Sequence, residues 1–299
     1  MIDLDRPETF VATPPRPPLD WRGAALQDAL APHCPGLLVR VLGDVASTNT
    51  HLLEACRARP TPLQAPLLLV AEQQSGGRGR QGRSWHSARG ASLAFSLAWP
   101  MQAADLSGLS LALGVALADA LDTGTGAAHR IGLKWPNDLW LLDATADAAR
   151  PGPTRGRKLG GILIETLNCG PQRVAIIGIG LNVLPLVVPD AASGVACLQE
   201  IDPNVDAPQA LHSVTLPLVQ ALRAFETGGF AGFEARYRRR DLLRGQEVQA
   251  GSLAGVALGV AANGALRLHC ADGERAIISG EVSVRLQSQA FAATPLAAC

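Results

Sequence analysis

The stretch that decides the fold is Ile131–Leu142, which reads IGLKWPNDLWLL. Two apolar runs, Ile131–Lys134 and Asp138–Leu142, flank a Trp-Pro-Asn segment, and proline followed by asparagine is typical of turns. We therefore expect two consecutive strands joined by a turn at this point. Consecutive strands favour a mixed β-sheet backed by helices over a strictly alternating βαβ arrangement.

Working outward from this stretch, apolar runs predict the remaining elements of an α+β fold. Further strands are expected at Leu37–Leu42, Leu67–Ala71, Ala91–Trp99, Lys158–Thr166 and Arg173–Val183. Helices are expected at Ala24–Leu30, from Ser47-Thr48-Asn49 to about Arg59, and at Leu106–Leu121, Pro208–Glu226 and Phe230–Arg239. Ser47 or Thr48 is a natural N-cap for the second of these helices.

The pattern changes at Gly245 to short strands with hairpin signals at Asn263-Gly264 and Asp272-Gly273. These signals predict a small separate β-barrel. The expected organisation is a proline-rich arm over residues 1–22, a larger unit over 23–240 and the small barrel over 241–290. The insertion 143–157, rich in alanine, proline, glycine and arginine, is expected to be an exposed loop.

Composition narrows the function classes. The 26 basic and 26 acidic residues cancel, which argues against a protein that covers nucleic acid or an anionic membrane. The sequence holds neither an apolar run of the roughly 20 residues that cross a bilayer nor a leader-like start, so a cytoplasmic location is expected. The six cysteines lack C-x-x-C spacing, so neither a zinc site nor a disulfide framework is indicated.

Lysine is rare in this chain. Of the 26 basic residues only Lys134 and Lys158 are lysine, which leaves 26 − 2 = 24 arginines. A compact ammonium and a planar guanidinium are not interchangeable at a tight anion site. Two exceptions to a strong arginine preference therefore point to positions where geometry requires lysine, although chance is the alternative.

The segment Glu72–Trp85 reads EQQSGGRGRQGRSW and is strongly basic. Its glycines let the backbone approach a ligand closely, and its arginines can pair with carboxylate or phosphate oxygens. Gly77–Gly82 spells G-x-G-x-x-G, but no long apolar helix follows, so a dinucleotide-binding motif is rejected. A kinase is rejected because H-R-D and D-F-G segments are missing. A solvated loop and an Arg-Gly RNA-binding segment remain alternatives.

Three further motifs carry polar groups at strand ends. Lys134–Asp138 (KWPND) presents a cation, an amide and a carboxylate in one corner, or is simply a turn. Lys158–Glu165 (KLGGILIE) opens an apolar strand with a lysine and two glycines, which either receive a ligand or leave the lysine facing solvent. Gly178–Val183 (GIGLNV) ends a strand with an amide that binds a base edge or caps the turn.

The order of these motifs resembles the biotin protein ligase family, from about Ser47 to Arg285. The resemblance rests on Ser47-Thr48-Asn49 followed by GRGRQGRSW, KWPND, KLGGILIE and GIGLNV. It implies a catalytic domain like that of class II aminoacyl-tRNA synthetases over 23–240 and an SH3-like barrel over 241–290. It also implies a monofunctional ligase, because the 46 residues before Ser47 are proline-rich and do not fit a DNA-binding domain.

The activity that the resemblance implies has two steps. Biotin and Mg²⁺-ATP form biotinyl-5'-AMP with release of pyrophosphate, and biotin then passes to a lysine of a biotin carboxyl carrier protein, such as an acetyl-CoA carboxylase subunit. DNA and membranes are not expected as partners, and a homodimer is left open. Which residues would hold a metal ion is left open.

The resemblance also implies roles for individual residues. The biotin site would comprise Ser47, Thr48, Asn49, Gln74, Arg78, Gly79, Arg80, Lys158, Gly160 and Gly161. The nucleotide would meet Arg80, Arg83, Trp85, Lys134, Asn137, Asn182 and Arg285. The implied catalytic residues are Lys158, Arg78, Arg80 and Asp138. Lys158 would stabilise charge between the biotin carboxylate and the α-phosphate. Asp138 would orient or deprotonate the acceptor lysine, unless its role is only to form the turn.

The sequence departs from the family pattern at two places. Gln81 replaces a third loop arginine that many relatives carry, and the insertion 143–157 widens the distance between KWPND and Lys158. A lipoate ligase is the alternative enzyme, because its fold and acyl-adenylate chemistry are similar. An RNA-binding module is opposed by the zero net charge and by an aromatic content of 4%.

Overall fold

A computed structural model describes residues 18–59, 61–122, 129–143, 156–186, 188 and 194–278, and the backbone of 284–286. Three regions considered above therefore lie wholly or largely outside the described residues: the arm up to residue 17, residues 144–155 of the insertion, and the segment 279–283 that precedes Arg285.

A seven-stranded mixed sheet forms the centre of the molecule, with strand order β1-β2-β5-β9-β8-β7-β6. Only β1 and β2 pair in parallel, and the other neighbours are antiparallel. The strands are β1 (Leu38–Val45), β2 (Leu67–Gln74), β5 (Ser92–Met101), β6 (Ile131–Lys134), β7 (Asp138–Leu142), β8 (Gly156–Cys169) and β9 (Gln172–Asn182). The predicted mixed sheet is confirmed, and β6 and β7 have the predicted bounds.

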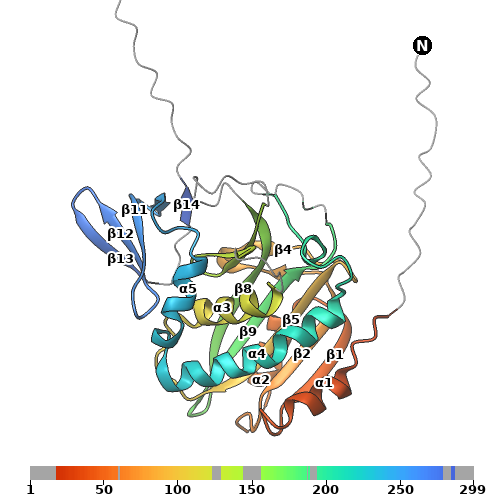
Figure 1. The fold of residues 1–299 in the computed structure, drawn as a ribbon. Helices are drawn as coiled ribbons and strands as arrows, with labels where there is room; N and C mark the ends of the chain where they lie inside the picture. The colour runs from red at the N-terminus through yellow and green to blue at the C-terminus, as the bar shows by residue number, and fades with distance from the viewer. Residues whose placement is uncertain are drawn as a thin grey trace, which may run out of the picture.

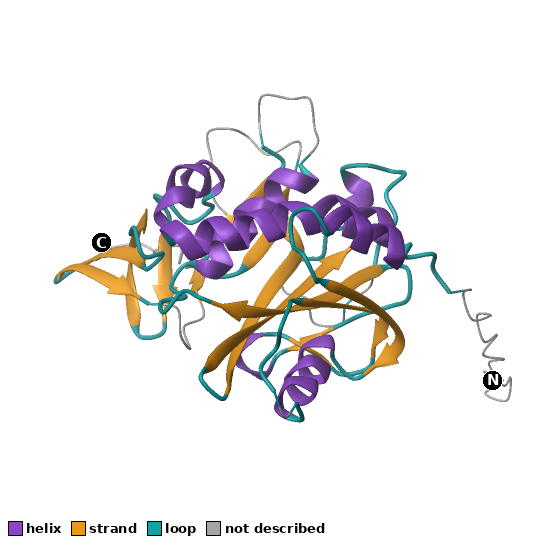
Figure 2. Cartoon of the chain, turned by 90° about the horizontal axis from the view of Figure 1, so that it is seen from below, coloured by secondary structure: helices purple, strands orange, loops and turns teal. Residues whose placement is uncertain are grey.

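Helices cover both faces of this sheet (Figure 2). One face packs against α1 (Gly23–Leu30), α3 (Leu109–Leu121), α4 (Ala207–Gly228) and α5 (Glu234–Arg240) in the larger apolar cluster. On the other face, Leu52 and Leu53 of α2 (Thr48–Arg57) pack in a smaller cluster. Helix α3 is apolar nearly all round, as expected for a helix buried between other elements.

Two predicted helices differ in detail from the structure. Helix α3 begins at Leu109 rather than Leu106, because Gly108 before it has a left-handed backbone with φ 80°. The predicted helix Phe230–Arg239 is divided into a 3₁₀ turn, Ala231–Phe233, and α5. Phe230 and Phe233 are both buried, and a spacing of three residues suits the three residues per turn of a 3₁₀ helix.

Strand β8 also differs from its prediction, in a way that decides where Lys158 points. It begins at Gly156, and its pairing with β7 shifts register beside Leu159. This β-bulge inserts one extra residue and reverses the alternation of side chains. Leu159 consequently enters the larger apolar cluster, whereas Lys158 lies on the same side as Gly161 and Leu163.

A second, five-stranded antiparallel sheet lies beside α5, in blue in Figure 1, with order β13-β12-β11-β10-β14. Its strands are β10 (Glu247–Ala250), β11 (Leu253–Val260), β12 (Leu266–Cys270), β13 (Gly273–Ile277) and β14 (Val284–Leu286). Both predicted hairpin glycines, Gly264 and Gly273, have positive φ angles. The segment between α5 and β10 contacts the larger sheet, where the Leu242 N–H donates to the Leu133 carbonyl of β6 at 3.0 Å.

None of the helices in the described ranges is long and apolar enough to span a membrane. The cysteines that the structure describes, Cys34, Cys56, Cys169, Cys197 and Cys270, are all unpaired.

Candidate active site

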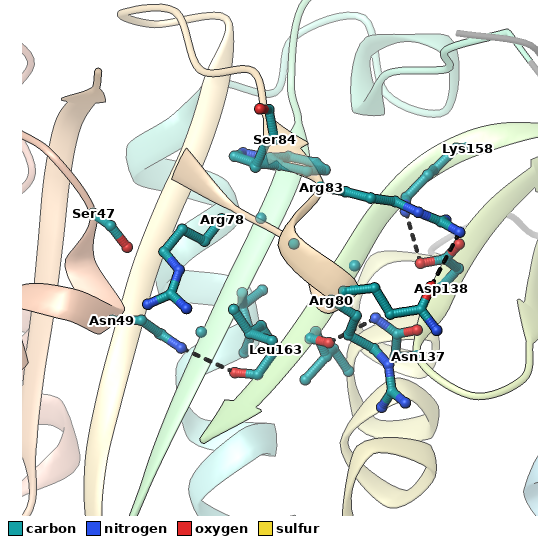
Figure 3. Close-up of a pocket in the computed structure, with 18 of the residues that line it drawn as sticks. Ser47, Asn49, Arg78, Arg80, Arg83, Ser84, Asn137, Asp138, Lys158 and Leu163 are labelled. Carbon is teal, nitrogen blue, oxygen red and sulfur yellow. Dashed lines mark hydrogen bonds and ion pairs between the residues drawn. The ribbon is translucent and has the colours of Figure 1, made fainter. Parts of the chain in front are cut away.

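A cavity of about 170 Å³ lies on the α2 face of the central sheet and extends from α2 to the β6–β7 turn (Figure 3). Predicted site residues make up most of its wall: Ser47, Thr48, Asn49, Gln74, Arg78, Gly79, Arg80, Arg83, Trp85, Lys134, Asn137, Asp138, Lys158 and Gly161. The sequence motifs, far apart in the chain, are thus brought together. The two ends of the cavity differ in chemistry.

The α2 end is neutral and is built from a chain of hydrogen bonds. Ser47 caps α2 by accepting the Thr50 N–H at 3.4 Å, which confirms it as the N-cap. The Thr48 N–H donates to Gln74 Oε1 at 2.7 Å, so the amide nitrogen of Gln74 is the group left over for other partners. Ser96 Oγ lies 2.6 Å from Asn49 Oδ1 and 2.7 Å from Thr48 Oγ1.

The chemistry of the donors and acceptors determines which group donates in each of these hydrogen bonds. An amide oxygen only accepts, so the Ser96 hydroxyl donates its single proton to Asn49 Oδ1. Ser96 then has no proton left for Thr48, whose own hydroxyl proton can reach Ser96 Oγ at 2.7 Å or Gln74 Oε1 at 3.0 Å. Thr48 Oγ1 is left with acceptor lone pairs, and Gln74 with amide donors. A ligand group that carries both N–H donors and a carbonyl acceptor complements this end.

The middle of the cavity has a floor of small residues in register across the sheet. Gly161 and Gly180, which line the cavity, are neighbours on β8 and β9, and Ala94 and Ala71 continue this row on β5 and β2 beyond the cavity lining. A Cβ added at Gly180 would lie 2.5 Å from the indole of Trp85, which therefore packs directly on the strand backbone. This floor leaves room for an apolar chain between the two ends.

Gly178 likewise leaves space above the strand backbone, in this case for the side chain of Asn49. It pairs with Ser96 on one side and Leu163 on the other. A Cβ at Gly178 would lie 2.2 Å from Asn49 Oδ1, so only glycine lets the Asn49 amide lie across the sheet. The first glycine of GIGLNV thus admits a buried amide, which sequence reasoning did not foresee.

The far end of the cavity is charged. Lys158 Nζ lies 2.8 Å from Asp138 Oδ1, and the side chains are 35% and 21% exposed, so ligand oxygens can reach both. Lys134 lies over the Trp140 ring, 4.7 Å from its centroid. Asn137 is held by two hydrogen bonds to Ile162. Its side-chain Nδ2 donates to the Ile162 carbonyl at 2.8 Å, and its main-chain carbonyl accepts the Ile162 N–H.

The loop that contains three of the arginines runs along the cavity. Its short strands β3 (Gly77–Arg78) and β4 (Ser84–Trp85) pair around the 3₁₀ turn Arg80–Gly82. Burial lowers the pKa of Arg80 from its ordinary value, and the negative charge of Asp138 opposes this shift. Gln81 at φ 57° and Gly82 at φ 71° make the left-handed corner of the loop.

Arg78 lies at the neutral end of the cavity (Figure 3). Its Nη1 is 3.6 Å from Glu165 Oε1 and 3.5 Å from Thr50 Oγ1. Lys158 and Asp138 occupy the opposite end. In this conformation the Arg78 guanidinium is therefore placed to act on the neutral part of a ligand rather than on an anion beside Lys158.

Two predicted site residues, Gly160 and Asn182, lie outside the cavity wall, and the side chain of a third, Arg285, is not among those described. Gly160 is buried outside the cavity wall, and a Cβ there would lie 2.5 Å from the Gly180 carbonyl oxygen. Asn182 is 4% exposed and donates to the carbonyls of Lys158 and Ala196, so it fixes the strand that carries Lys158. Arg285 lies on β14 opposite Gln249, and its side chain is outside the description.

Two residues that support the site were missed from the sequence. Ser96 is fully buried in β5, and Glu165 lies behind Asn49 on β8. A serine in the middle of the apolar run Leu93–Met101 was the available signal for Ser96, because a buried hydroxyl needs a partner. Glu165 ends the quoted KLGGILIE motif but had been given no role.

Comparison with known proteins identifies the class that this fold and cavity define. A model described as the biotin/lipoate A/B protein ligase family matches residues 42–182. A second model, the biotin protein ligase C terminal domain, matches residues 245–285. The two matches cover the large sheet with its cavity and most of the small sheet.

Individual relatives show which members of this class the chain is similar to. The bifunctional ligase/repressor BirA of Escherichia coli (strain K12) is 32% identical over 256 residues, 83% of this chain and 74% of that protein. A biotin--[acetyl-CoA-carboxylase] ligase of Mycobacterium tuberculosis is 34% identical over 248 residues, 78% of this chain and 82% of that protein. The biotin protein ligase from Aquifex aeolicus in complex with biotin and ATP superposes with a TM-score of 0.68 at 27% identity, covering 83% and 99% of the two chains. The chain belongs to the biotin protein ligase family and is a ligase.

Proposed function

We propose that this chain activates biotin with ATP to biotinyl-5'-AMP and transfers biotin to a lysine of a biotin carboxyl carrier protein. One observation carries the proposal: a single cavity joins a neutral hydrogen-bonding end to a cationic end across a floor of small residues. Biotin has the matching order of parts, a ureido ring, an apolar chain and a carboxylate.

The neutral end suits the ureido ring. Thr48 Oγ1 would accept a ureido N–H, and the Gln74 amide would donate to the ureido oxygen, with Ser47 and Asn49 completing the contacts. Gly161 and the small-residue floor would receive the apolar chain. Gly79 and the loop arginines Arg78 and Arg80 would cover the bound ligand and exclude water.

The cationic end suits the chemistry. In the first step a carboxylate oxygen of biotin attacks the α-phosphorus, and the bond to pyrophosphate breaks. In the second step the acceptor amine attacks the acyl carbon, AMP leaves, and the amine gives up a proton. Lys158 would stabilise the charge at the α-phosphate in both steps, assisted by Arg80. Asp138, which pairs with Lys158, would also orient or deprotonate the incoming amine.

The nucleotide would extend along the loop side of the cavity. Trp85 lines the cavity, and its Nε1 is buried with no hydrogen-bond partner among the described residues. Lys134, Asn137 and Arg83 would complete this surface, and Asn182 and Arg285 are retained as proposed contacts. Asp138 is the one carboxylate lining the described cavity, so Mg²⁺ would be held chiefly by ATP phosphates, whose charge it neutralises.

Finer features are part of the same proposal. We assign residues 23–240 to a catalytic domain like that of class II aminoacyl-tRNA synthetases and residues 241–290 to an SH3-like domain. Unpaired cysteines support a cytoplasmic location. The zero net charge supports a carrier protein rather than DNA as the macromolecular partner. A homodimer remains compatible with this assignment.

Release of pyrophosphate from Mg²⁺-ATP tests the proposal without an acceptor. Release should depend on biotin and be negligible with lipoate at the same concentration. Release with lipoate and none with biotin would overturn the assignment in favour of a lipoate ligase.

A further inference from the structure

Glu165 lies behind the cavity and binds a residue that lines it. It belongs to β8, two residues beyond Leu163, and its side chain is 25% exposed. Its Oε2 accepts the Asn49 amide Nδ2 at 3.0 Å, and its Oε1 lies 3.6 Å from Arg78 Nη1. Glu165 itself is not part of the described cavity wall, so any effect on a ligand passes through Asn49 or Arg78.

The Asn49 amide spans the backbone of Gly178 and is held from both sides. Ser96 Oγ lies on its oxygen side, while Glu165 and the Leu163 carbonyl, at 3.3 Å, lie on its nitrogen side. An ionised carboxylate and a backbone carbonyl only accept hydrogen bonds. They therefore require the Asn49 NH₂ to face β8 and its oxygen to face Ser96.

The orientation of the Asn49 amide determines which groups donate and which accept in the rest of this hydrogen-bond network. With the Asn49 oxygen facing it, Ser96 donates its single proton to Asn49 and has none left for Thr48. The Thr48 proton goes to Ser96 Oγ or to Gln74 Oε1, and in both cases the two lone pairs of Thr48 Oγ1 stay open. A flipped Asn49 amide would donate to Ser96, and Ser96 would donate to Thr48. One of the Thr48 lone pairs would then be occupied before a ligand arrived.

We propose that Glu165 is a positioning residue for biotin: by fixing the Asn49 amide it keeps Thr48 Oγ1 available to accept a ureido N–H. This inference rests on the proposed function, because it assigns the neutral end of the cavity to the ureido ring. Glu165 makes no contact with the reacting atoms, so it contributes to biotin affinity and not to the chemical steps.

Isothermal titration of biotin, without ATP, tests the inference. Glu165→Ala should weaken biotin binding about tenfold, as expected for loss of a hydrogen bond that involves a charged group. Glu165→Gln keeps an oxygen for Asn49 and should lose less. The control is Glu54→Ala, an exposed carboxylate on α2, which should bind like wild type. The kcat for transfer at saturating biotin should be unchanged in all three variants.

A double-mutant cycle with Asn49→Ala separates positioning from a general effect on the fold. If Glu165 acts through Asn49, Glu165→Ala should cause no more than a twofold loss when Asn49 is already alanine. Equal losses in both backgrounds, or a folded Glu165→Ala within twofold of wild type, would overturn the inference. If Glu165→Ala does not fold, the same cycle is run with Glu165→Gln. Absence of biotin binding by wild type would overturn the inference together with the proposed function.

Discussion

The two ends of the cavity are built on different physical principles. At the neutral end Ser47, Thr48, Asn49 and Gln74 are each less than 10% exposed, and the last three are linked through hydrogen bonds and Ser96. At the charged end, Lys158 and Asp138 remain partly exposed and form an ion pair whose strength depends on what binds beside it.

The difference indicates where each kind of interaction is useful. A buried, fully directed chain of neutral groups is set before the ligand arrives, so it selects the ligand with little reorganisation. A partly exposed cation is best used on charge that develops as the reaction proceeds. Variants at the neutral end should therefore change affinity, and variants at the charged end should change rate.

The largest effect is expected for Lys158→Arg. The guanidinium is longer and planar, so it displaces the positive charge from the position that the bulge at Leu159 gives the ammonium. A positional error of about 1 Å costs on the order of a hundredfold, so single-turnover adenylation should fall by roughly that factor. Biotin affinity should change much less.

The control for this variant is Arg239→Lys, an exposed position on α5, which should have the wild-type rate. Circular dichroism of both proteins checks folding. A folded Lys158→Arg enzyme within about threefold of the wild-type rate would remove Lys158 from the catalytic residues, because this ratio is well under 1.4 kcal/mol.

Gly178→Ala should have the opposite signature at the neutral end. The new methyl group would displace the Asn49 amide, whose oxygen lies 2.2 Å from the added Cβ position. Biotin affinity should fall by about tenfold or more, while adenylation at saturating biotin should be retained. Gly43→Ala is the matched control, since nothing lies within 4 Å of its added Cβ. Equal biotin affinity in the two variants would contradict the role of the Asn49 chain.

The loop that connects the two ends should respond to ligand by a smaller factor. Its glycines are costly to order and its arginines repel one another until an anion is present. Biotin with ATP should slow tryptic cleavage after Arg78, Arg80 or Arg83 severalfold, and biotin alone should slow it less. If cleavage proceeds at one rate with and without both ligands, the loop does not close over them.

The smallest effect is expected on stability, at a buried carboxyl group that packs beside the charged end of the cavity. Asp241 follows α5 and bridges to Leu133, next to Lys134, and burial raises its pKa from 3.8 to about 6. A raised carboxyl pKa favours the folded state at low pH, and this contribution is lost as pH rises from about 4 through 6. Asp241→Asn should therefore raise the free energy of unfolding by about 1–3 kcal/mol at pH 8 and by little at pH 4.

Urea unfolding of both proteins at the two pH values measures this difference. A variant that is destabilised at pH 8 would show that the Asp241 charge is compensated in the folded state.

The sequence predicted the elements of the sheet better than the details that orient the side chains. The apolar runs and the turn residues between them were sufficient to predict the bounds of β6 and β7. The order and spacing of the motifs were sufficient to predict most of the residues that line the cavity. The bulge at Leu159 was not predictable, because register depends on the partner strand rather than on local pattern. The role of Gly178 was not predictable either, because the side chain that it accommodates, Asn49, belongs to α2 and is distant in the sequence.

The central claim is that this cavity joins biotin to AMP before any acceptor protein is needed. The direct measurement is mass spectrometry of the small molecules bound after incubation of the protein with biotin, lipoate and Mg²⁺-ATP. Biotinyl-AMP should accumulate, because the neutral end selects the ureido ring and the charged end brings the carboxylate to the α-phosphate. Lipoyl-AMP without biotinyl-AMP would contradict the account.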